Sequence, residues 1–232
     1  MDHWGNTYDN KIPVEFVKPW ERPLDISLAL TELRKHRRFK EAIDEKRIGA
    51  LGFSYGGYTV LALAGAVVDY KILLRYFATE EGKRDLDAIT EFPGLSELIG
   101  KPAFTAMTNN VPELKDTRIK AFFAISPGTA SGFISKEQFN DIDAPVFIVG
   151  CEADSVTPVE KYAKHYHRLI DGSDYYEFSG HVGHYVMLSE VNEALQNESP
   201  IPFSDHPTVN RKKVHQKVAE LAGNFFGESL KP

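Results

Sequence analysis

The sequence is poor in the features that mark several large classes of protein. Only one of its 232 residues is a cysteine, Cys151, so no disulfide can form within the chain. It contains no apolar run long enough to span a bilayer and no signal-peptide pattern. Its net charge of −6 favours neither nucleic acid nor an acidic membrane surface as a partner. The sequence does not decide between a cytoplasmic and a periplasmic protein.

The composition provides enough apolar material for one globular domain. Hydrophobic residues make up 42% of the chain, and its length fits one α/β domain. We expect a single domain over residues 1–232, with an insertion at 69–118 where charges and turn-forming residues interrupt the alternation of strands and helices. Our interpretation of the insertion is a helical cap over the site, and the alternative is a peripheral decoration.

The most informative segment is residues 52–57, with the sequence Gly-Phe-Ser-Tyr-Gly-Gly. The apolar run 47–53 predicts a strand, and the Ala- and Leu-rich run 58–68 predicts a helix. A G-x-S-x-G sequence between a strand and a helix is a nucleophile elbow. We expect Ser54 to have unfavourable φ and ψ angles in a sharp turn that leaves no room for a Cβ on either flanking glycine. We also expect the Tyr55 N–H to face a developing oxyanion. The alternative is an ordinary glycine-rich turn.

The acid of a catalytic triad is expected after the next strong apolar run. Residues 145–151 are too short for a helix and rich in β-branched side chains, so they predict a buried strand. Asp154, in the polar turn that follows, is the candidate for the carboxylate that orients the imidazole. Glu152 is an alternative acid. Asp154 is alternatively the cap of a helix that opens near Pro158, although Thr157 is better placed for that cap.

The base is expected on the loop after the predicted strand 175–178. His184 follows a glycine and precedes an apolar run that can anchor the loop, so we choose it over His181. The order Ser, Asp, His along the chain is that of the α/β-hydrolases. His165 and His167 have a spacing that suits a metal on a strand, but the surrounding apolar residues recur with helical spacing and turn the two rings apart. We expect no metal and no other cofactor.

Taken together, these segments resemble the bacterial predicted dienelactone hydrolases, a branch of the α/β-hydrolases. The resemblance covers nearly the whole chain, is weakest at 69–118, and lies in residues 2–7, 22–26, 47–57, 183–188 and 210–226. It implies an α/β fold, an α/β-hydrolase-like mostly parallel sheet flanked by helices, and a serine hydrolase with Ser54, Asp154 and His184 as its triad. Dienelactone hydrolases themselves use a cysteine nucleophile, so the resemblance names no substrate.

The α/β-hydrolase pattern takes a second oxyanion N–H from a loop two elements ahead of the nucleophile strand. Only 53 residues precede Ser54, and they hold one predicted helix, about residues 23–38, with Ile26, Leu30 and Leu33 on one face. We therefore expect a chain that begins just after strand four and lacks half of the oxyanion hole; the alternative is a divergent fold. The unpaired edge of the nucleophile strand would then promote aggregation or pairing with another chain.

The expected function is cleavage of a small-molecule ester or lactone through an acyl-enzyme. Two alternatives stay open. Residues 54–58 (Ser-Tyr-Gly-Gly-Tyr) are similar to prolyl oligopeptidase catalytic domains, although the chain has no β-propeller to act as a gate. The other alternative is a non-catalytic binding protein with the same fold.

The C-terminal residues predict an amphipathic helix that packs on the sheet. Its apolar stripe consists of Val214, Val218, Leu221 and Phe225. Its solvated face is expected to carry Arg211, Lys212, Lys213 and Lys217.

Overall fold

Four parallel strands form the centre of the protein. The structure is a computed structural model that describes residues 2–7, 9–89, 92–198 and 200–231. The strands are β1 (Gly49–Phe53), β2 (Ala121–Ile125), β3 (Val146–Cys151) and β4 (Asp174–Phe178). They lie in the order β1-β2-β3-β4, and every neighbouring pair is parallel. The expected α/β fold, a parallel sheet flanked by helices, is confirmed.

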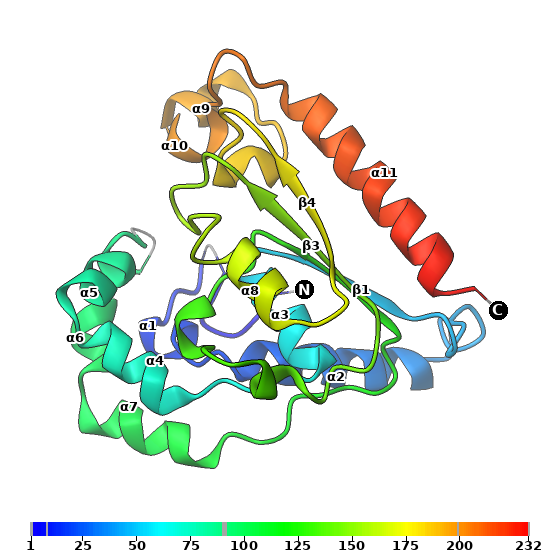
Figure 1. The fold of residues 1–232 in the computed structure, drawn as a ribbon, viewed down its shortest axis with the longest axis horizontal. Helices are drawn as coiled ribbons and strands as arrows, with labels where there is room; N and C mark the ends of the chain where they lie inside the picture. Colours follow the sequence, from blue (N-terminus) through cyan, green and yellow to red (C-terminus); the bar gives the residue numbers. More distant parts are fainter. Residues whose placement is uncertain (1, 8, 90–91, 199, 232) are drawn as a thin grey trace.

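Helices cover both faces of this sheet (Figure 1). Alternate residues of β2 point to opposite faces: Phe122 and Ala124 pack into one apolar cluster, and Phe123 and Ile125 pack into another. The first cluster contains side chains of α2 (Glu21–Lys35), α3 (Tyr55–Ala64) and α8 (Ala163–Leu169). The second contains the apolar stripe of α11 (Arg211–Ser229), as the sequence predicts. A strand covered on both sides explains why β2 is a continuous apolar run.

Two helices differ from their predicted form. Leu33 was expected on the buried face of α2, but the residue is 43% exposed, whereas Ile26 and Leu30 pack against the core. The helix expected to open near Pro158 begins at Ala163. Residues 152–162 therefore form an extended series of turns between β3 and α8, and this irregular segment contains Asp154.

The nucleophile strand β1 lies at the edge of the sheet. It pairs with β2 on one side, and among the described residues no strand pairs with its other side. Leu51, at the centre of β1, is 50% exposed. An open edge with an exposed apolar residue agrees with the sequence expectation for this strand, and pairing with another chain there stays a prediction.

Residues 69–118 hold a group of short helices on one side of the sheet (Figure 1). These are α4 (Tyr70–Phe77), α5 (Glu80–Asp87), α6 (Leu95–Ile99), α7 (Pro102–Met107) and the 3₁₀ turn η1 (Thr108–Asn110). Asp69 caps α4 and Thr79 caps α5 through side-chain hydrogen bonds. Their apolar side chains form a third cluster together with Phe16 of α1 (Pro13–Phe16) and the adjacent Val17. Because Phe16 also contacts Tyr55, this cluster lies near the nucleophile turn.

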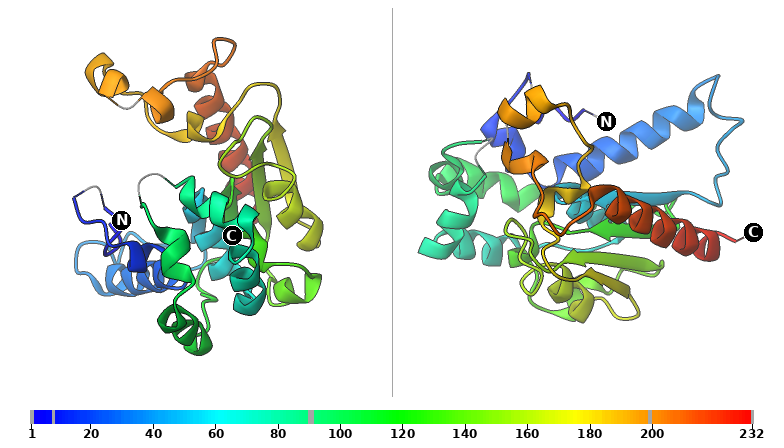
Figure 2. Two further views of the ribbon diagram at one scale, coloured as in Figure 1. Left: turned by 90° about the vertical axis from the view of Figure 1, so that its left-hand side faces the viewer. Right: turned by 90° about the horizontal axis from the view of Figure 1, so that it is seen from above.

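Short helices between β4 and α11 project from the body of the molecule, as the left view of Figure 2 shows. They are α9 (Glu193–Glu198) and α10 (Pro200–Phe203), whereas the 3₁₀ turn η4 (His184–Met187) before them is packed against the core with His184 and Val186 buried. Two further 3₁₀ turns, η2 (Ala130–Gly132) and η3 (Lys136–Phe139), follow β2. Neither α9 nor α10 contains a buried residue. In the part of the chain that the structure describes, no helix combines the length and the apolar character needed to cross a membrane.

Candidate active site

Ser54 occupies a strained turn between β1 and α3. Its φ of 56° and ψ of −119° lie outside the regions that non-glycine residues commonly adopt, as expected for an elbow. Two backbone hydrogen bonds hold this conformation: Ser54 N donates to Ile125 O at 2.8 Å, and Gly128 N donates to Ser54 O at 2.9 Å. The end of β2 and the loop behind it therefore fix the position of the Ser54 hydroxyl.

The glycines around Ser54 are crowded in a different pattern from the one expected. A Cβ on Gly52 would lie 2.0 Å from Gly56 O, and one on Gly57 would lie 2.8 Å from the Cα of Pro127. A Cβ on Gly56 would have no neighbour within 4 Å. The expectation of crowding at both glycines of the G-x-S-x-G sequence is thus wrong for Gly56, because its Cα faces open space. The close approach to the loop after β2 falls on Gly57 instead.

A chain of hydrogen bonds connects Ser54, His184 and Asp154. His184 Nε2 lies 2.9 Å from Ser54 Oγ, and His184 Nδ1 lies 2.7 Å from Asp154 Oδ2. An ionised carboxylate can only accept, so Nδ1 carries the proton and Nε2 is left to accept from the serine hydroxyl. Both His184 and Asp154 are buried. The structure therefore brings together the three residues that the sequence proposed as a triad, from loops behind β1, β3 and β4.

The carboxylate of Asp154 accepts hydrogen bonds on both oxygens. Oδ1 accepts from Val156 N at 2.9 Å and Thr157 N at 2.6 Å. Oδ2 accepts from Thr157 Oγ1 at 2.8 Å in addition to His184. Thr157 is therefore not a helix cap, as the sequence suggested, but a partner of Asp154. The bonds from Val156 N and Thr157 N to the Asp154 side chain are of the local kind that competes with helix formation, so the turn at Asp154 was open to prediction from its residue type.

The alternative acid and base lie outside this hydrogen-bond chain. Glu152 Oε2 accepts from Gly180 N at 2.6 Å on the surface. His181 is exposed and stacks on His206 with 3.8 Å between ring centroids. The geometry therefore favours Asp154 over Glu152 and His184 over His181 as the partners of Ser54.

Two aromatic rings and a helix support the imidazole of His184. The ring of Phe53 lies 4.7 Å from it, and the ring of Tyr185 lies edge-on at 5.3 Å. The ring of His215 in α11 contacts the same turn, with Nε2 2.6 Å from Val186 O. Because a carbonyl can only accept, His215 Nε2 donates in this bond. The first turns of α11 thus support the turn that carries His184.

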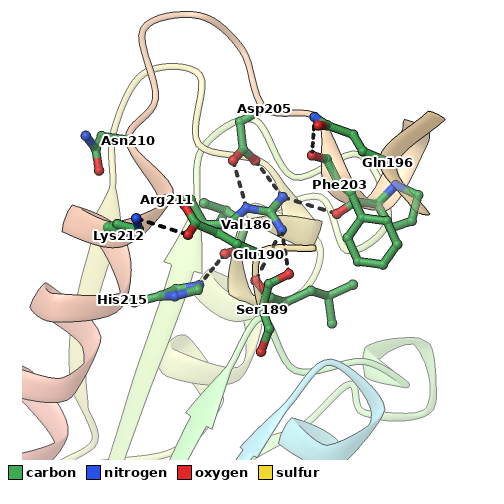
Figure 3. Close-up of polar contacts among 12 residues, drawn as sticks. Val186, Ser189, Glu190, Gln196, Phe203, Asp205, Asn210, Arg211, Lys212 and His215 are labelled. Carbon is green, nitrogen blue, oxygen red and sulfur yellow. Dashed lines mark hydrogen bonds and ion pairs between the residues drawn. The ribbon is translucent and has the colours of Figure 1, made fainter. Parts of the chain in front are cut away.

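Arg211 strengthens the link between α11 and the His184 turn (Figure 3). Its guanidinium binds both oxygens of Asp205, at 2.8 and 3.0 Å, and donates to Leu188 O at 3.1 Å and Pro202 O at 3.1 Å. A longer contact of 3.4 Å reaches Ser189 O. The sequence placed Arg211 on the solvated face of α11, and this is wrong: Arg211 is buried, because the segment between η4 and α11 folds over it.

Tyr55 begins α3 and lies against a group of aromatic residues. As the first residue of the helix, it has an N–H without a helical acceptor, as the proposed oxyanion role requires. Its hydroxyl donates to Phe16 O at 2.9 Å, and the Arg22 guanidinium lies 4.3 Å from the centre of its ring. Burial raises the pKa of Tyr55, so the phenol stays neutral at physiological pH. The side chain is thereby fixed, and the backbone N–H beside Ser54 is fixed with it.

The structure offers no assembled metal site among the residues it describes, where no group of three or more His, Cys, Asp or Glu side chains converges. The rings of His165 and His167 bind different partners. His165 Nε2 lies 2.7 Å from Phe133 O, and His167 Nδ1 lies 2.8 Å from Ser173 Oγ. The two rings thus turn apart along α8, as their helical spacing predicts.

Comparison with known proteins gives distant structural similarity. No protein-family model and no curated protein matches the chain. A predicted CIB-like hydrolase from Thermoplasma acidophilum superposes with a TM-score of 0.44 at 13% identity, over 96% of this chain and 70% of that one. An esterase from Pyrococcus furiosus gives 0.42 at 18% identity, over 90% and 63%. A carboxylesterase from Lactobacillus plantarum gives 0.39 at 16% identity, over 90% and 70%.

This chain thus spans 63% to 70% of the length of these three structures. TM-scores below 0.5 do not assign it to a family.

Proposed function

We propose that the protein is a serine hydrolase that cleaves carboxylic esters or lactones through an acyl-enzyme. The observation that carries this proposal is the hydrogen-bond chain from Ser54 Oγ through His184 to Asp154, beginning at a strained elbow. A serine hydroxyl is a weak nucleophile by itself, and an adjacent base oriented by a third group activates it. This chain has the required partners in the required order.

In the proposed reaction, His184 Nε2 takes the proton from Ser54 Oγ as the oxygen attacks the carbonyl carbon. Asp154 stabilises the imidazolium that forms, and the Tyr55 N–H donates to the oxyanion of the tetrahedral intermediate. His184 then protonates the departing alkoxide, which leaves the acyl group on Ser54. A water molecule, deprotonated by His184, hydrolyses this acyl-enzyme and restores the free hydroxyl.

An ester or lactone is favoured over an amide for a chemical reason. An alkoxide is a better leaving group than an amine, so it needs less protonation in the transition state. We propose that the helices of residues 69–118 act as a cap that shapes the pocket for the acyl or leaving group. The position of these helices supports the proposed cap. Phe92, next to α6, stacks on Phe16 with 4.2 Å between ring centroids, and Phe16 contacts Tyr55 beside the nucleophile.

Labelling with a fluorophosphonate tests the proposal, because a serine activated by a base reacts and an ordinary serine does not. We expect one label per chain on the wild type and none on Ser54→Ala or His184→Ala. Ser204→Ala, which removes an exposed serine, should label like the wild type. A panel of short-chain esters, lactones and Ala-Pro or Gly-Pro amides then identifies the class of substrate. Cleavage of the amides would favour a prolyl-oligopeptidase-like peptidase, and a folded protein without labelling would favour a binding protein.

A further inference from the structure

The hydroxyl of Thr157 contacts both the acid and the base of the proposed triad. Thr157 Oγ1 lies 2.8 Å from Asp154 Oδ2 and 3.2 Å from His184 Nδ1. The side chain is buried, with 6% of the residue exposed. Three polar groups from two loops therefore meet at one point, and Thr157 is the member that cannot carry a charge.

The proton of the Thr157 hydroxyl has one good acceptor. Asp154 Oδ2 lies at 2.8 Å, whereas the next acceptor, Ser126 O, lies at 3.4 Å. With that proton given to Oδ2, the lone pairs of Oγ1 are free to face the Nδ1–H of His184. The imidazole N–H then lies between two oxygens, 2.7 Å from the carboxylate and 3.2 Å from the hydroxyl.

The position of Thr157 matters because Oδ2 of the carboxylate has little other support. Asp154 lies in the turns between β3 and α8, where no helix or strand fixes the backbone. The two backbone donors, Val156 N and Thr157 N, both bind Oδ1. Among the contacts that the structure gives, Thr157 Oγ1 is the one that fixes Oδ2 besides the histidine itself.

We propose that Thr157 is a positioning residue for ester hydrolysis: its hydroxyl directs Asp154 Oδ2 at His184 Nδ1. The inference rests on the proposed function. Without the hydroxyl, Oδ2 keeps His184 as its one hydrogen-bond partner among the contacts that the structure gives. The carboxylate is then free to turn, and the imidazole loses the fixed orientation in which Nε2 accepts from Ser54.

Two ionisable side chains near Asp154, Cys151 and Tyr162, carry no charge at physiological pH. Burial is the main reason why the pKa of the Cys151 thiol is raised to about 12, and the same holds for the Tyr162 hydroxyl, also at about 12. The negative charge of Asp154 contributes to both shifts. Neither group is therefore a second anion beside the hydrogen bond between Asp154 and His184.

Thr157→Val is the main test, because valine keeps the shape and the backbone N–H and removes the hydroxyl. For a good ester substrate we expect kcat to fall about 10- to 100-fold with KM changed less than threefold. The downfield proton resonance of His184 Nδ1–H should shift in Thr157→Val, and Thr157→Ser should restore both the rate and the resonance. Thr208→Val, at an exposed threonine, is the matched control and should behave like the wild type.

A role in packing alone predicts a different result. It would lower the melting temperature of Thr157→Val without changing kcat or the resonance of His184 Nδ1–H, and that outcome overturns the inference. A Thr157→Val variant with wild-type kcat overturns it as well. If Thr157→Val does not fold, Thr157→Ala takes its place in the same measurements, and a wild-type kcat in Thr157→Ala is again contrary. Wild-type protein that fails to label or hydrolyse esters would instead overturn the proposed function, so the two failures are distinguishable.

Discussion

The guanidinium of Arg211 binds both carboxylate oxygens of Asp205, at 2.8 and 3.0 Å, inside the protein. Arg211 is the first residue of α11, and Asp205 lies six positions before it. The same guanidinium donates to Leu188 O, directly after the turn that carries His184. One buried cation therefore connects the last helix to the candidate base.

Arg211→Met should lower the free energy of unfolding by about 3 kcal/mol, because it leaves a partly buried carboxylate and several carbonyls without a donor. The measurement is equilibrium unfolding in urea. Lys212→Met is the matched control: its side chain is 72% exposed and its contact with Glu190 is 3.2 Å long, so we expect a change within about 0.5 kcal/mol. Equal stability of the two variants would show that the Arg211 contacts contribute little.

Gly52→Ala and Gly56→Ala should change stability in opposite directions. The new methyl group at Gly52 would lie 2.0 Å from a backbone oxygen, and overpacking of this kind costs about 1–3 kcal/mol or more. Gly56 lies in α3 with free space around it, and alanine there should stabilise the helix by about 0.5–1 kcal/mol. Thermal unfolding measures both. A destabilised Gly56→Ala would mean that the turn is more crowded than its geometry indicates.

Asp154→Asn should reduce kcat for ester hydrolysis by about 10⁴-fold, because an amide no longer fixes the tautomer of His184 or stabilises its protonated form. Glu152→Gln, at the alternative acid, should keep kcat within a few-fold of the wild type. The two variants are compared with one ester at saturating concentration. A larger loss in Glu152→Gln than in Asp154→Asn would exchange the roles of the two carboxylates.

The stabilising effect of Asp116 on the fold should be lost in acid. Burial raises the pKa of this carboxyl, but hydrogen bonds from Arg118 and Ser27 outweigh burial and hold the pKa below its usual value. The unfolded chain therefore binds more protons in the acid range, so Asp116 stabilises the fold above its unfolded pKa of about 3.9 and loses this effect as the pH falls through the folded value.

We therefore expect the stability difference between the wild type and Asp116→Asn to shrink between about pH 5 and pH 3. Urea midpoints at several pH values measure it. Asp171→Asn, with a side chain 79% exposed, should show a small difference at every pH. A difference for Asp116→Asn that stays constant down to pH 3 would contradict the assigned role of the Arg118 and Ser27 bonds.

Local patterns were sufficient for the parts of the protein that depend on neighbours in the sequence. The apolar run before Ser54 predicted β1, and the spacing of Val214, Val218, Leu221 and Phe225 predicted the buried stripe of α11. The same is true of the strained backbone of Ser54, because the flanking glycines and the strand-to-helix change lie within a few residues.

Features that depend on how the loops fold could not be predicted from the sequence. Arg211 has the composition of a surface residue, and it is buried because the loop carrying Asp205 returns over it. Thr157 precedes a proline, which is typical of a helix start, but the bond to Asp154 determines its conformation. Nothing near Gly56 in the sequence shows which of the neighbouring glycines faces the loop after β2.

The candidate site also has a consequence for the kinetics of folding. Ser54, Asp154 and His184 follow β1, β3 and β4, and β2 joins β1 to β3 through parallel pairings between segments far apart in the chain. Such pairings have high contact order and form slowly, after the local helices. During refolding, the return of fluorophosphonate reactivity should therefore lag behind the return of helical circular dichroism. The nucleophile is assembled at the end of folding, when the sheet is complete.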